Sequence, residues 1–373
     1  MDKKIETLIF IKNSTDPSAF YRIIQYFDNQ DNICYCKYSS DWIYRWYYDI
    51  GKKRLRKKNG FVNMIRKGIL AAYGILHNSF LIFYWRHKDI KNIVINRTAF
   101  PRVFPFYESK SLMKLLMNRN VIWDFDDNII ENKEISTKEL KILMKYSSKI
   151  VVSNTYLKEM LPVEIRNKVK ILCTTDRTFE NNDIELLIHN RMKSYSQQIV
   201  LIWVGTRDNV KYLNSTMDIL DQTAKELKSC YGKQLVLWCV SNTNLGGEYK
   251  WIQVENLIWS RETAVERLKE AHIGLMPLEC NQYTLGKAGF KAVQYISSGM
   301  PALVSDVGYC KEVIMNEKNG FVVSKMDEWR EGILRLATNE NLYIQYALEA
   351  RKVWEDKFDS NVNQSFWEEL TKS

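Results

Sequence analysis

The sequence predicts an α/β protein with two domains, each built on a parallel β-sheet that is covered by helices on both faces. Short apolar runs that do not alternate with polar residues recur along the chain, as in strands buried on both sides. Helical stretches separate these runs, which is typical of a doubly wound arrangement. The chain of 373 residues is longer than one ordinary core organises, so we expect two such domains.

The second half of the chain shows this alternation most clearly. A strand at 199–204 ends at Gly205, and a helix is expected from about 210 to 227. Gly299 is placed to close a helix over 289–299. Further strands are expected at 234–242, 256–260, 273–279, 301–306 and 320–323, and further helices at 262–271 and 310–316.

The first half carries the same pattern with more interruption. Ser136 and Glu139 form a capping box at the start of a helix over 136–148. Strands are expected at 7–12, 92–97, 120–128, 149–154 and 168–173, and a helix at 155–161. The polar stretch 180–198 is the expected domain junction. Because ligands bind outside the carboxyl ends of the strands in such domains, we expect functional side chains there, in a cleft between the halves.

Charge and cysteine content narrow the classes of partner and compartment. The formal net charge of +10 indicates nucleic acid, anionic lipid or a phosphorylated ligand, with simple solubility as the alternative. None of the seven cysteines forms a C-x-x-C pair, so we expect buried free thiols in a reducing compartment. The short apolar run near the start fits a first strand better than a secretory signal.

Residues 51–88 form a segment with ten basic residues and no acidic one. An uncharged run at 68–85 lies inside it, and five aromatic residues come just before it: Trp42, Tyr44, Trp46, Tyr47 and Tyr48. A transmembrane helix, a nucleic-acid surface, or a solvated loop followed by a core helix would each explain part of this pattern. We favour a peripheral membrane surface over residues 42–88, because bases suit anionic head groups and aromatic rings suit the interface.

Three acids, Asp124, Asp126 and Asp127, follow a predicted strand. Asp124 and Asp126 form a D-x-D pattern, which could hold a divalent metal against a diphosphate through hard oxygen ligands. A turn stabilised by an aspartate side chain is the structural alternative.

Two stretches of the second half could bind phosphate. Gly205 ends a strand and is followed by Thr206, Arg207 and Lys211 at the start of a helix, where backbone N–H groups favour anions. The second stretch is "GKAGFKAVQ", in which Lys287 and Lys291 flank another helix start. Like charges repel at that spacing, and a diphosphate would relieve the repulsion. The dinucleotide G-x-G-x-x-G and P-loop patterns are absent.

These stretches carry a resemblance to a known family. The run from Ile273 to Val323, with "GKAGFKAVQYISSGMPALVSDVG", resembles the C-terminal domain of bacterial glycosyltransferase family 4, in its polysaccharide-assembly branch. "WVGTRDNVKYL" and "NRTAFPR…VIWDFDD" are similar to two other segments of that branch. The resemblance covers most of residues 93–370 and is loose over the first 90.

The resemblance implies a GT-B fold, in which two Rossmann-like doubly wound domains face a cleft. Residues 1–185 would form the acceptor domain and 195–355 the nucleotide-sugar domain, with a C-terminal helix at about 356–373 packing back on the first. It implies retaining transfer that needs no cofactor, with a divalent metal possible but not expected. The partners would be a nucleotide-sugar donor and a glycan or lipid-linked glycan, with no nucleic acid, at the inner face of a membrane in the cytoplasm.

The family's site residues carry over only in part. Many members have two glutamates where this chain has Gly286 and Gln294, so Gln294 would bond the ribose and Gly286 cannot contact the sugar. The expected donor site comprises Gly205, Thr206, Arg207, Lys211, Glu279, Lys287, Gly289, Phe290, Lys291 and Gln294. The expected catalytic groups are Asp124, Asp126, Asp127 and Lys291. The alternatives are a metal-dependent transferase using Asp124 and Asp126, and an inactive relative that serves as a scaffold.

Overall fold

The computed structural model describes residues 4–28, 30–43 and 60–372, and the side chains of 60–63 are outside that description. Clustering of contacts divides the chain into two compact units. The first runs to Cys173 and also takes in Asn363 and the residues after it, and the second spans Thr174–Val362. Each unit contains one parallel six-stranded sheet, so the predicted fold class is confirmed.

The first unit is built on the sheet β2-β1-β3-β4-β5-β6. Its strands are β1 (Thr7–Ile11), β2 (Ile33–Lys37), β3 (Asn92–Asn96), β4 (Asn120–Phe125), β5 (Lys149–Val152) and β6 (Val169–Ile171). Its helices are α1 (Pro17–Ala19), the π-helical η1 (Phe20–Ile24), α2 (Gln25–Phe27), α4 (Gly60–Trp85), α5 (Glu108–Leu116), α6 (Thr137–Tyr146), α7 (Thr155–Met160), η2 (Val163–Lys168) and α17 (Ser360–Lys372).

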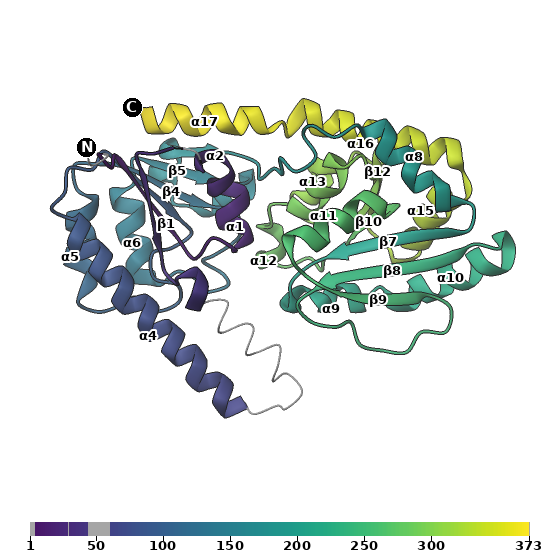
Figure 1. The fold of residues 1–373 in the computed structure, drawn as a ribbon, viewed down its shortest axis with the longest axis horizontal. Helices are drawn as coiled ribbons and strands as arrows, with labels where there is room; N and C mark the ends of the chain where they lie inside the picture. Colours follow the sequence, from purple (N-terminus) through teal and green to yellow (C-terminus); the bar gives the residue numbers. More distant parts are fainter. Residues whose placement is uncertain (1–3, 29, 44–59, 373) are drawn as a thin grey trace. The chain divides into compact units, whose positions relative to one another are not determined.

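Both faces of this sheet are covered, which is why its strands show apolar runs without alternation. One face packs under α4, α5 and α6, around Phe10, Trp123 and Phe125. The other face packs under η1, α2 and α17, where Trp367 is fully buried and its ring centre lies 5.7 Å from that of Phe27. Figure 1 shows α17 lying along this unit.

The second unit has the strand order β12-β11-β10-β7-β8-β9. Its strands are β7 (Gln198–Val204), β8 (Gln234–Ser241), β9 (Gln253–Ile258), β10 (Ile273–Met276), β11 (Ala302–Ser305) and β12 (Gly320–Val323). Its helices are α8 (Ile184–Tyr195), η3 (Arg207–Asn209), α9 (Val210–Asn214), α10 (Met217–Tyr231), α11 (Arg261–Glu270), α12 (Gln282–Leu285), α13 (Phe290–Ser297), α14 (Cys310–Val313), α15 (Met326–Thr338) and α16 (Glu340–Lys357).

Two segments differ from the sequence-based expectation. The polar stretch 180–198 contains α8, whose buried Leu187, Ile188, Arg191 and Tyr195 pack inside the second unit, while the chain passes between units at Cys173–Thr174 and Val362–Asn363. The single helix expected over 210–227 is two helices, because the Ser215 and Thr216 hydroxyls donate to carbonyls of the preceding turn and break the run.

Candidate functional site

The donor residues expected from the sequence lie at the carboxyl edge of the second sheet. The strand order is β12-β11-β10-β7-β8-β9. After β7 the chain adds β8 and β9 on one side of β7, and it then returns to add β10, β11 and β12 on the other side. The crevice at such a reversal of strand order is where open α/β sheets bind ligands. Gly205 follows β7, and the segment 277–289 follows β10, so the topology brings both predicted phosphate stretches to the same edge.

The turn after β7 requires glycine at position 205. A Cβ atom there would lie 2.3 Å from the ring of Trp203, and the Gly205 N–H donates to Val240 O at 3.1 Å. The next residues are fixed by short-range bonds: the Arg207 N–H donates to Asn242 Oδ1 at 3.0 Å, and Asn209 Nδ2 donates to Thr206 Oγ1 at 3.0 Å. Arg207 and Lys211 are exposed at this turn, so both cations are open to an anionic ligand.

The loop after β10 is held by its own side chains. Asn281 and Thr284 form a capping box at the start of α12, and Thr284 Oγ1 donates to Glu279 O at 2.5 Å. The Glu279 side chain itself is exposed. Gly289 then takes the left-handed conformation (φ 65°) that starts α13 at Phe290, a conformation that favours glycine. The loop therefore presents the N-terminus of α13 at the sheet edge.

Lys291, Gln294 and Asp176 form one bonded chain in the second unit. Lys291 Nζ donates to Gln294 Oε1 at 2.8 Å, and Gln294 Nε2 donates to Asp176 Oδ2 at 2.7 Å. Asp176 is fully buried and also accepts from the N–H and hydroxyl of Thr178. Gln294 is 2% exposed with both ends of its amide engaged, so this arrangement does not offer it to a ribose.

Burial changes the chemistry of Lys291. Burial lowers the pKa of Lys291 to about 8, with Asp176 opposing the shift and nearby Lys287 adding to it. Lys287 is itself largely buried, and its Nζ lies 4.7 Å from the ring centre of Tyr283. Two lysines that repel each other at the N-terminus of α13 are suited to a multivalent anion, which would offset their repulsion.

Two sets of contacts fix the position of α13. Gly274 on β10 lets the ring of Tyr295 pack against the strand, where a Cβ would lie 2.3 Å from that ring. The Tyr295 hydroxyl donates to Leu275 O at 3.0 Å and accepts from the Val204 N–H at 3.3 Å, which ties α13 to β10 and β7. At its carboxyl end, buried Arg191 and Arg351 donate to the carbonyls of residues 297–299. Positive charge there suits the helix dipole.

The predicted acids lie at the carboxyl edge of the first sheet, in a closed network. Asp124 is fully buried and accepts from Arg22 and from Asn96 Nδ2, the latter at 2.9 Å. Burial raises the pKa of Asp124, and the Arg22 guanidinium opposes that rise. Arg22 also donates to Leu172 O, so the pair links η1 to β4 and to the end of β6. This is the geometry of a structural ion pair.

Asp126 and Asp127 share Arg97, whose φ of 62° turns the chain after β3. Arg97 donates to Asp126 and Asp127 at 2.8 Å and to Glu134 at 3.1 Å, and Ser18 Oγ donates to Asp126 at 2.7 Å. Burial would raise the pKa of Asp126, but Arg97 and Arg22 outweigh it and the pKa is lowered. The Asp127 side chain is 22% exposed, which makes it the most open of the three predicted acids.

These acids fit the metal-binding alternative poorly, because both oxygens of Asp124 and the Oδ1 of Asp126 already accept from guanidinium groups. Within residues 4–28, 30–43 and 60–372, no group of three or more histidine, cysteine, aspartate or glutamate side chains is arranged to hold a metal ion.

Glu139 stabilises the loop that follows β3 at the carboxyl edge of the first sheet. It is fully buried, and it accepts from Thr98 Oγ1 and the Ala99 N–H at 2.6 Å, which fixes the loop that carries Arg97. Burial raises the pKa of Glu139 to about 7. The sequence predicted a capping box in which Glu139 bonds back to Ser136. The Ser136 side chain does cap the helix, but that prediction is wrong for Glu139, whose carboxylate bonds a loop 40 residues earlier in the chain instead.

Arg22, Asn96 and Asp176 were missed by sequence analysis. Arg22 and Asn96 are single polar residues in apolar segments, and Asp176 lies in an irregular segment after β6. The one feature of the sequence that could have indicated them is their position at or beyond the ends of predicted strands, where functional side chains are expected.

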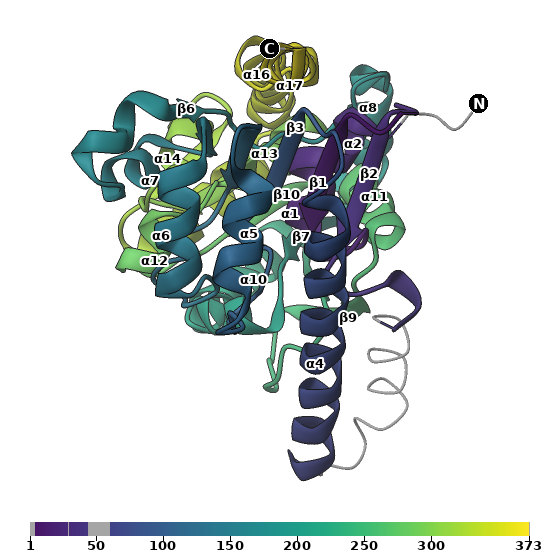
Figure 2. The same ribbon diagram turned by 90° about the vertical axis from the view of Figure 1, so that its left-hand side faces the viewer.

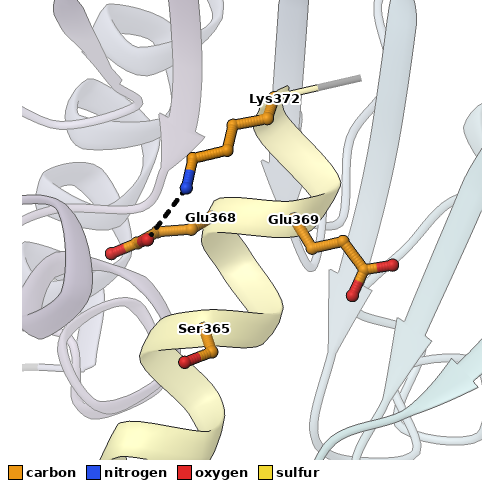
Figure 3. A pocket seen from close by; sticks show the side chains of 4 residues that line it. All are labelled: Ser365, Glu368, Glu369 and Lys372. Atoms are coloured by element: carbon orange, nitrogen blue, oxygen red, sulfur yellow. Dashed lines mark hydrogen bonds and ion pairs between the residues drawn. The ribbon is translucent and has the colours of Figure 1, made fainter.

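A shallow hollow of about 560 Å³ opens on α17, lined by Ser365, Glu368, Glu369 and Lys372 (Figure 3). Asn92 and Asn120, the first residues of β3 and β4, donate to Thr371 O and Leu370 O at this end of α17. The hollow therefore lies at the amino edge of the first sheet, away from the acids, and Lys372 Nζ pairs with Glu368 at 3.2 Å across it.

Comparisons with known proteins bear on the second unit. Residues 198–339 match the family model described as glycosyl transferases group 1. The matched segment begins with β7 and contains the Gly205 turn, the loop after β10 and α13. A search of curated proteins found no match.

Several solved structures share the two-domain fold. Anabaena Alr3699/HepE in complex with UDP and glucose aligns with a TM-score of 0.66 at 11% identity, covering 99% of this chain and 100% of that one. A UDP-forming α,α-trehalose-phosphate synthase from Burkholderia xenovorans aligns with a TM-score of 0.63 at 10% identity, covering 99% of each. A sucrose-phosphate synthase from Thermosynechococcus elongatus gives 0.53 at 12%, covering 80% and 77%. At these identities the likeness shows the GT-B fold.

Proposed function

We propose that this protein transfers a sugar from a nucleoside diphosphate donor to a glycan acceptor and binds the diphosphate at the carboxyl edge of its second sheet. The observation that carries the proposal is the Lys287–Lys291 pair at the N-terminus of α13, inside the matched glycosyltransferase domain. Arg207 and Lys211 extend the positive charge along the same edge. UDP is the first donor nucleotide to test, because HepE was solved with UDP and glucose.

The proposed mechanism is electrostatic. The bond between the sugar and the diphosphate breaks with negative charge growing on the leaving phosphate, and cations that are already in place stabilise that charge without reorganising. Lys287 and Lys291 are held by the loop and by Gln294, so they meet this requirement. We propose that transfer is retaining, as the resemblance to family 4 implies. We also propose that it needs no metal, since the lysines supply positive charge and Asp124 and Asp126 pair with arginines.

We further propose that the acceptor is a lipid-linked surface glycan and that the protein works at the cytoplasmic face of a membrane. The support is the basic segment at 51–88, of which residues 51–59 lie outside the described part of the chain. Asp127 is the acid best placed to meet an acceptor hydroxyl, because it is partly exposed while Asp124 is closed.

A thermal-shift screen of the full chain with UDP, GDP and other nucleoside diphosphates tests the donor site. A ligand at about 100 times its Kd stabilises a protein by roughly 2.7 kcal/mol, which such a screen detects. The double variant Lys287→Met/Lys291→Met should lose the shift, and Lys228→Met, an exposed lysine on α10, should keep it. Absence of any shift, or an unchanged shift in the double variant, would contradict the proposal.

An inactive relative is the second candidate, favoured by one observation: Gln294, at a position where many family 4 members have glutamate, is bonded at both ends of its amide. Turnover separates the two. Release of UDP from a UDP-sugar that persists in EDTA and disappears in Lys287→Met/Lys291→Met supports the metal-independent enzyme. Binding without turnover, over a panel of donors and acceptors, supports the inactive relative.

A further inference from the structure

Helix α4 exposes a row of apolar side chains on the face that does not pack on the first unit. Ile65, Ile69, Leu76, Phe80 and Phe83 are 46%, 55%, 66%, 63% and 57% exposed. At 100° per residue these positions fall within about 60° of one another around the helix, so they form one continuous stripe. We call these five residues the outer stripe. An exposed apolar surface of this size is unusual and marks an interaction site.

The opposite face of α4 is the one that packs on the first unit. Gly74, Asn78 and Ile82 are buried, and a Cβ at Gly74 would lie 2.4 Å from the ring of Tyr38. Asn78 Nδ2 donates to Ala99 O at 2.6 Å, and the Tyr38 hydroxyl donates to Ala71 O at 3.1 Å. The helix is therefore anchored by one face, and the outer stripe is the face that the domain leaves uncovered.

The start of α4 projects past the carboxyl edge of the first sheet. The helix has 26 residues, about 39 Å at 1.5 Å per residue, whereas β3 has five, about 17 Å. Since α4 ends at Trp85 and β3 begins at Asn92, the two run in opposite directions and the excess length lies beyond the carboxyl ends of the strands. Figure 2 shows this half of α4 extending from the unit.

The charged residues of the described segment 60–88 are all basic: Arg66, Lys67, Arg86 and Lys88. Arg66 lies beside the start of the stripe, and at its other end Arg86 stacks 4.0 Å from the ring centre of Phe83. An apolar stripe with basic flanks and aromatic rings is the surface of an interfacial membrane helix.

We propose that α4 docks this protein on an anionic lipid bilayer by inserting its outer stripe at the interface. A second copy is a poorer occupant, because a two-fold interface would place the same basic flanks against each other. Met64–Trp85 is long and apolar enough to cross a bilayer by length and composition alone, with a mean hydropathy of 1.2. The buried bonds of Asn78 and Ala71 hold the helix against the domain instead, so it lies on the membrane.

If the protein is the transferase proposed above, docking through α4 also affects how the acceptor reaches it. The projecting half of α4 and the Arg97–Asp127 network lie at the same edge of the first sheet. Docking there brings the head groups of lipid-linked molecules to the edge at which we propose that the acceptor binds. The docking itself requires neither donor nor acceptor.

Vesicle co-sedimentation of the full chain tests the docking separately from catalysis. The wild type should sediment with vesicles of phosphatidylcholine and phosphatidylglycerol, and less with phosphatidylcholine alone or at high salt. The variant Ile69→Asp/Leu76→Asp/Phe80→Asp should bind at least about tenfold more weakly. The matched control Val163→Asp/Ile258→Asp/Met326→Asp changes three other exposed apolar residues and should bind as the wild type does.

Three outcomes would overturn the proposal: no sedimentation of the wild type, an unchanged stripe variant, or a wild-type dimer that the stripe variant abolishes. Extraction of the native protein only by detergent, and not by alkaline carbonate, would also overturn it in favour of a spanning helix. If the stripe variant misfolds, quenching of tryptophan fluorescence by brominated lipids in the wild type decides instead. A UDP thermal shift that persists in the stripe variant shows that the donor site is intact.

Discussion

At the residue scale, Lys291 connects the packing of the second unit with its proposed chemistry. Its side chain is half-buried, its ammonium is repelled by Lys287 and donates to Gln294, and Asp176 bonds the other end of that amide. Keeping a positive charge there without an anion costs free energy, and a bound diphosphate would offset that cost. The sequence showed the two lysines, but it could not show Asp176, which comes from an irregular segment 115 residues earlier (291 minus 176).

The lowered pKa of Lys291 gives donor binding a pH dependence. The folded pKa of about 8 is below the unfolded 10.5, so the unfolded chain binds more protons between these values and the stability of the free protein rises with pH there. The diphosphate needs the protonated lysine, so its affinity should fall up to about tenfold between pH 7 and pH 9. Titration calorimetry with UDP measures this, and Lys291→Arg should flatten the profile. Parallel profiles for the two proteins would contradict the assignment.

Substitutions of Asp124 and Asp127 should show which of these acids stabilises the fold and which acts in the proposed reaction. Asp124→Asn leaves Arg22 buried beside a neutral amide, and breaking a buried ion pair costs about 3–5 kcal/mol. Asp127→Asn should cost less than about 1 kcal/mol, because Arg97 keeps Asp126 and Glu134. Thermal unfolding measures both. Asp127→Asn should then lower kcat in a folded protein, and a normal melting temperature for Asp124→Asn would refute the structural role.

At the element scale, the start of α13 depends on one backbone conformation. Sequence analysis placed a helix at 289–299 and two flanking lysines, and the structure has α13 at Phe290–Ser297. It did not foresee that Tyr295 would tie the helix to two strands, because that contact depends on the absence of a side chain at Gly274. Periodicity located this helix, whereas its fixed orientation comes from packing.

Gly289→Ala tests whether that conformation serves ligand binding. The left-handed φ of 65° should cost an alanine about 1 kcal/mol and disturb the α13 N-terminus, so both stability and UDP affinity should fall. Gly232→Ala is the matched control, since Gly232 has φ 70° and open space around its Cβ at the end of α10. It should lose similar stability and keep its UDP affinity. Equal UDP affinities in the two variants would count against a role for the α13 N-terminus.

At the scale of the whole molecule, the first unit is completed by residues from the end of the chain. Trp367 on α17 is fully buried against Phe27, and Asn363 Nδ2 donates to Cys173 O at 2.8 Å. The resemblance implied a C-terminal helix packing on the first domain, and α17 covers one face of the first sheet. Trp367 therefore belongs to the hydrophobic core of the first unit, together with side chains of its strands.

Trp367→Ala should therefore destabilise the first unit alone. Truncation of a buried tryptophan costs about 3–5 kcal/mol, so this unit should unfold first while the second still binds UDP. Trp329→Ala removes a tryptophan from the core of the second unit and should instead weaken the UDP-dependent thermal shift. Limited proteolysis with and without UDP distinguishes the two. Loss of UDP binding in Trp367→Ala would show that the units are not independent.

The sequence by itself determined the alternation of strands and helices, the fold class and the lysines of the proposed donor site, because these follow from local periodicity and spacing. Tertiary structure decided which polar side chains are buried in ion pairs and which are exposed to solvent. Asp124 and Asp127 look alike in the sequence, yet one is paired with Arg22 in the core and the other is partly exposed. It also decided that the apolar stripe of α4 faces outward, since an apolar pattern shows that a helix has such a face but not which way the fold turns it.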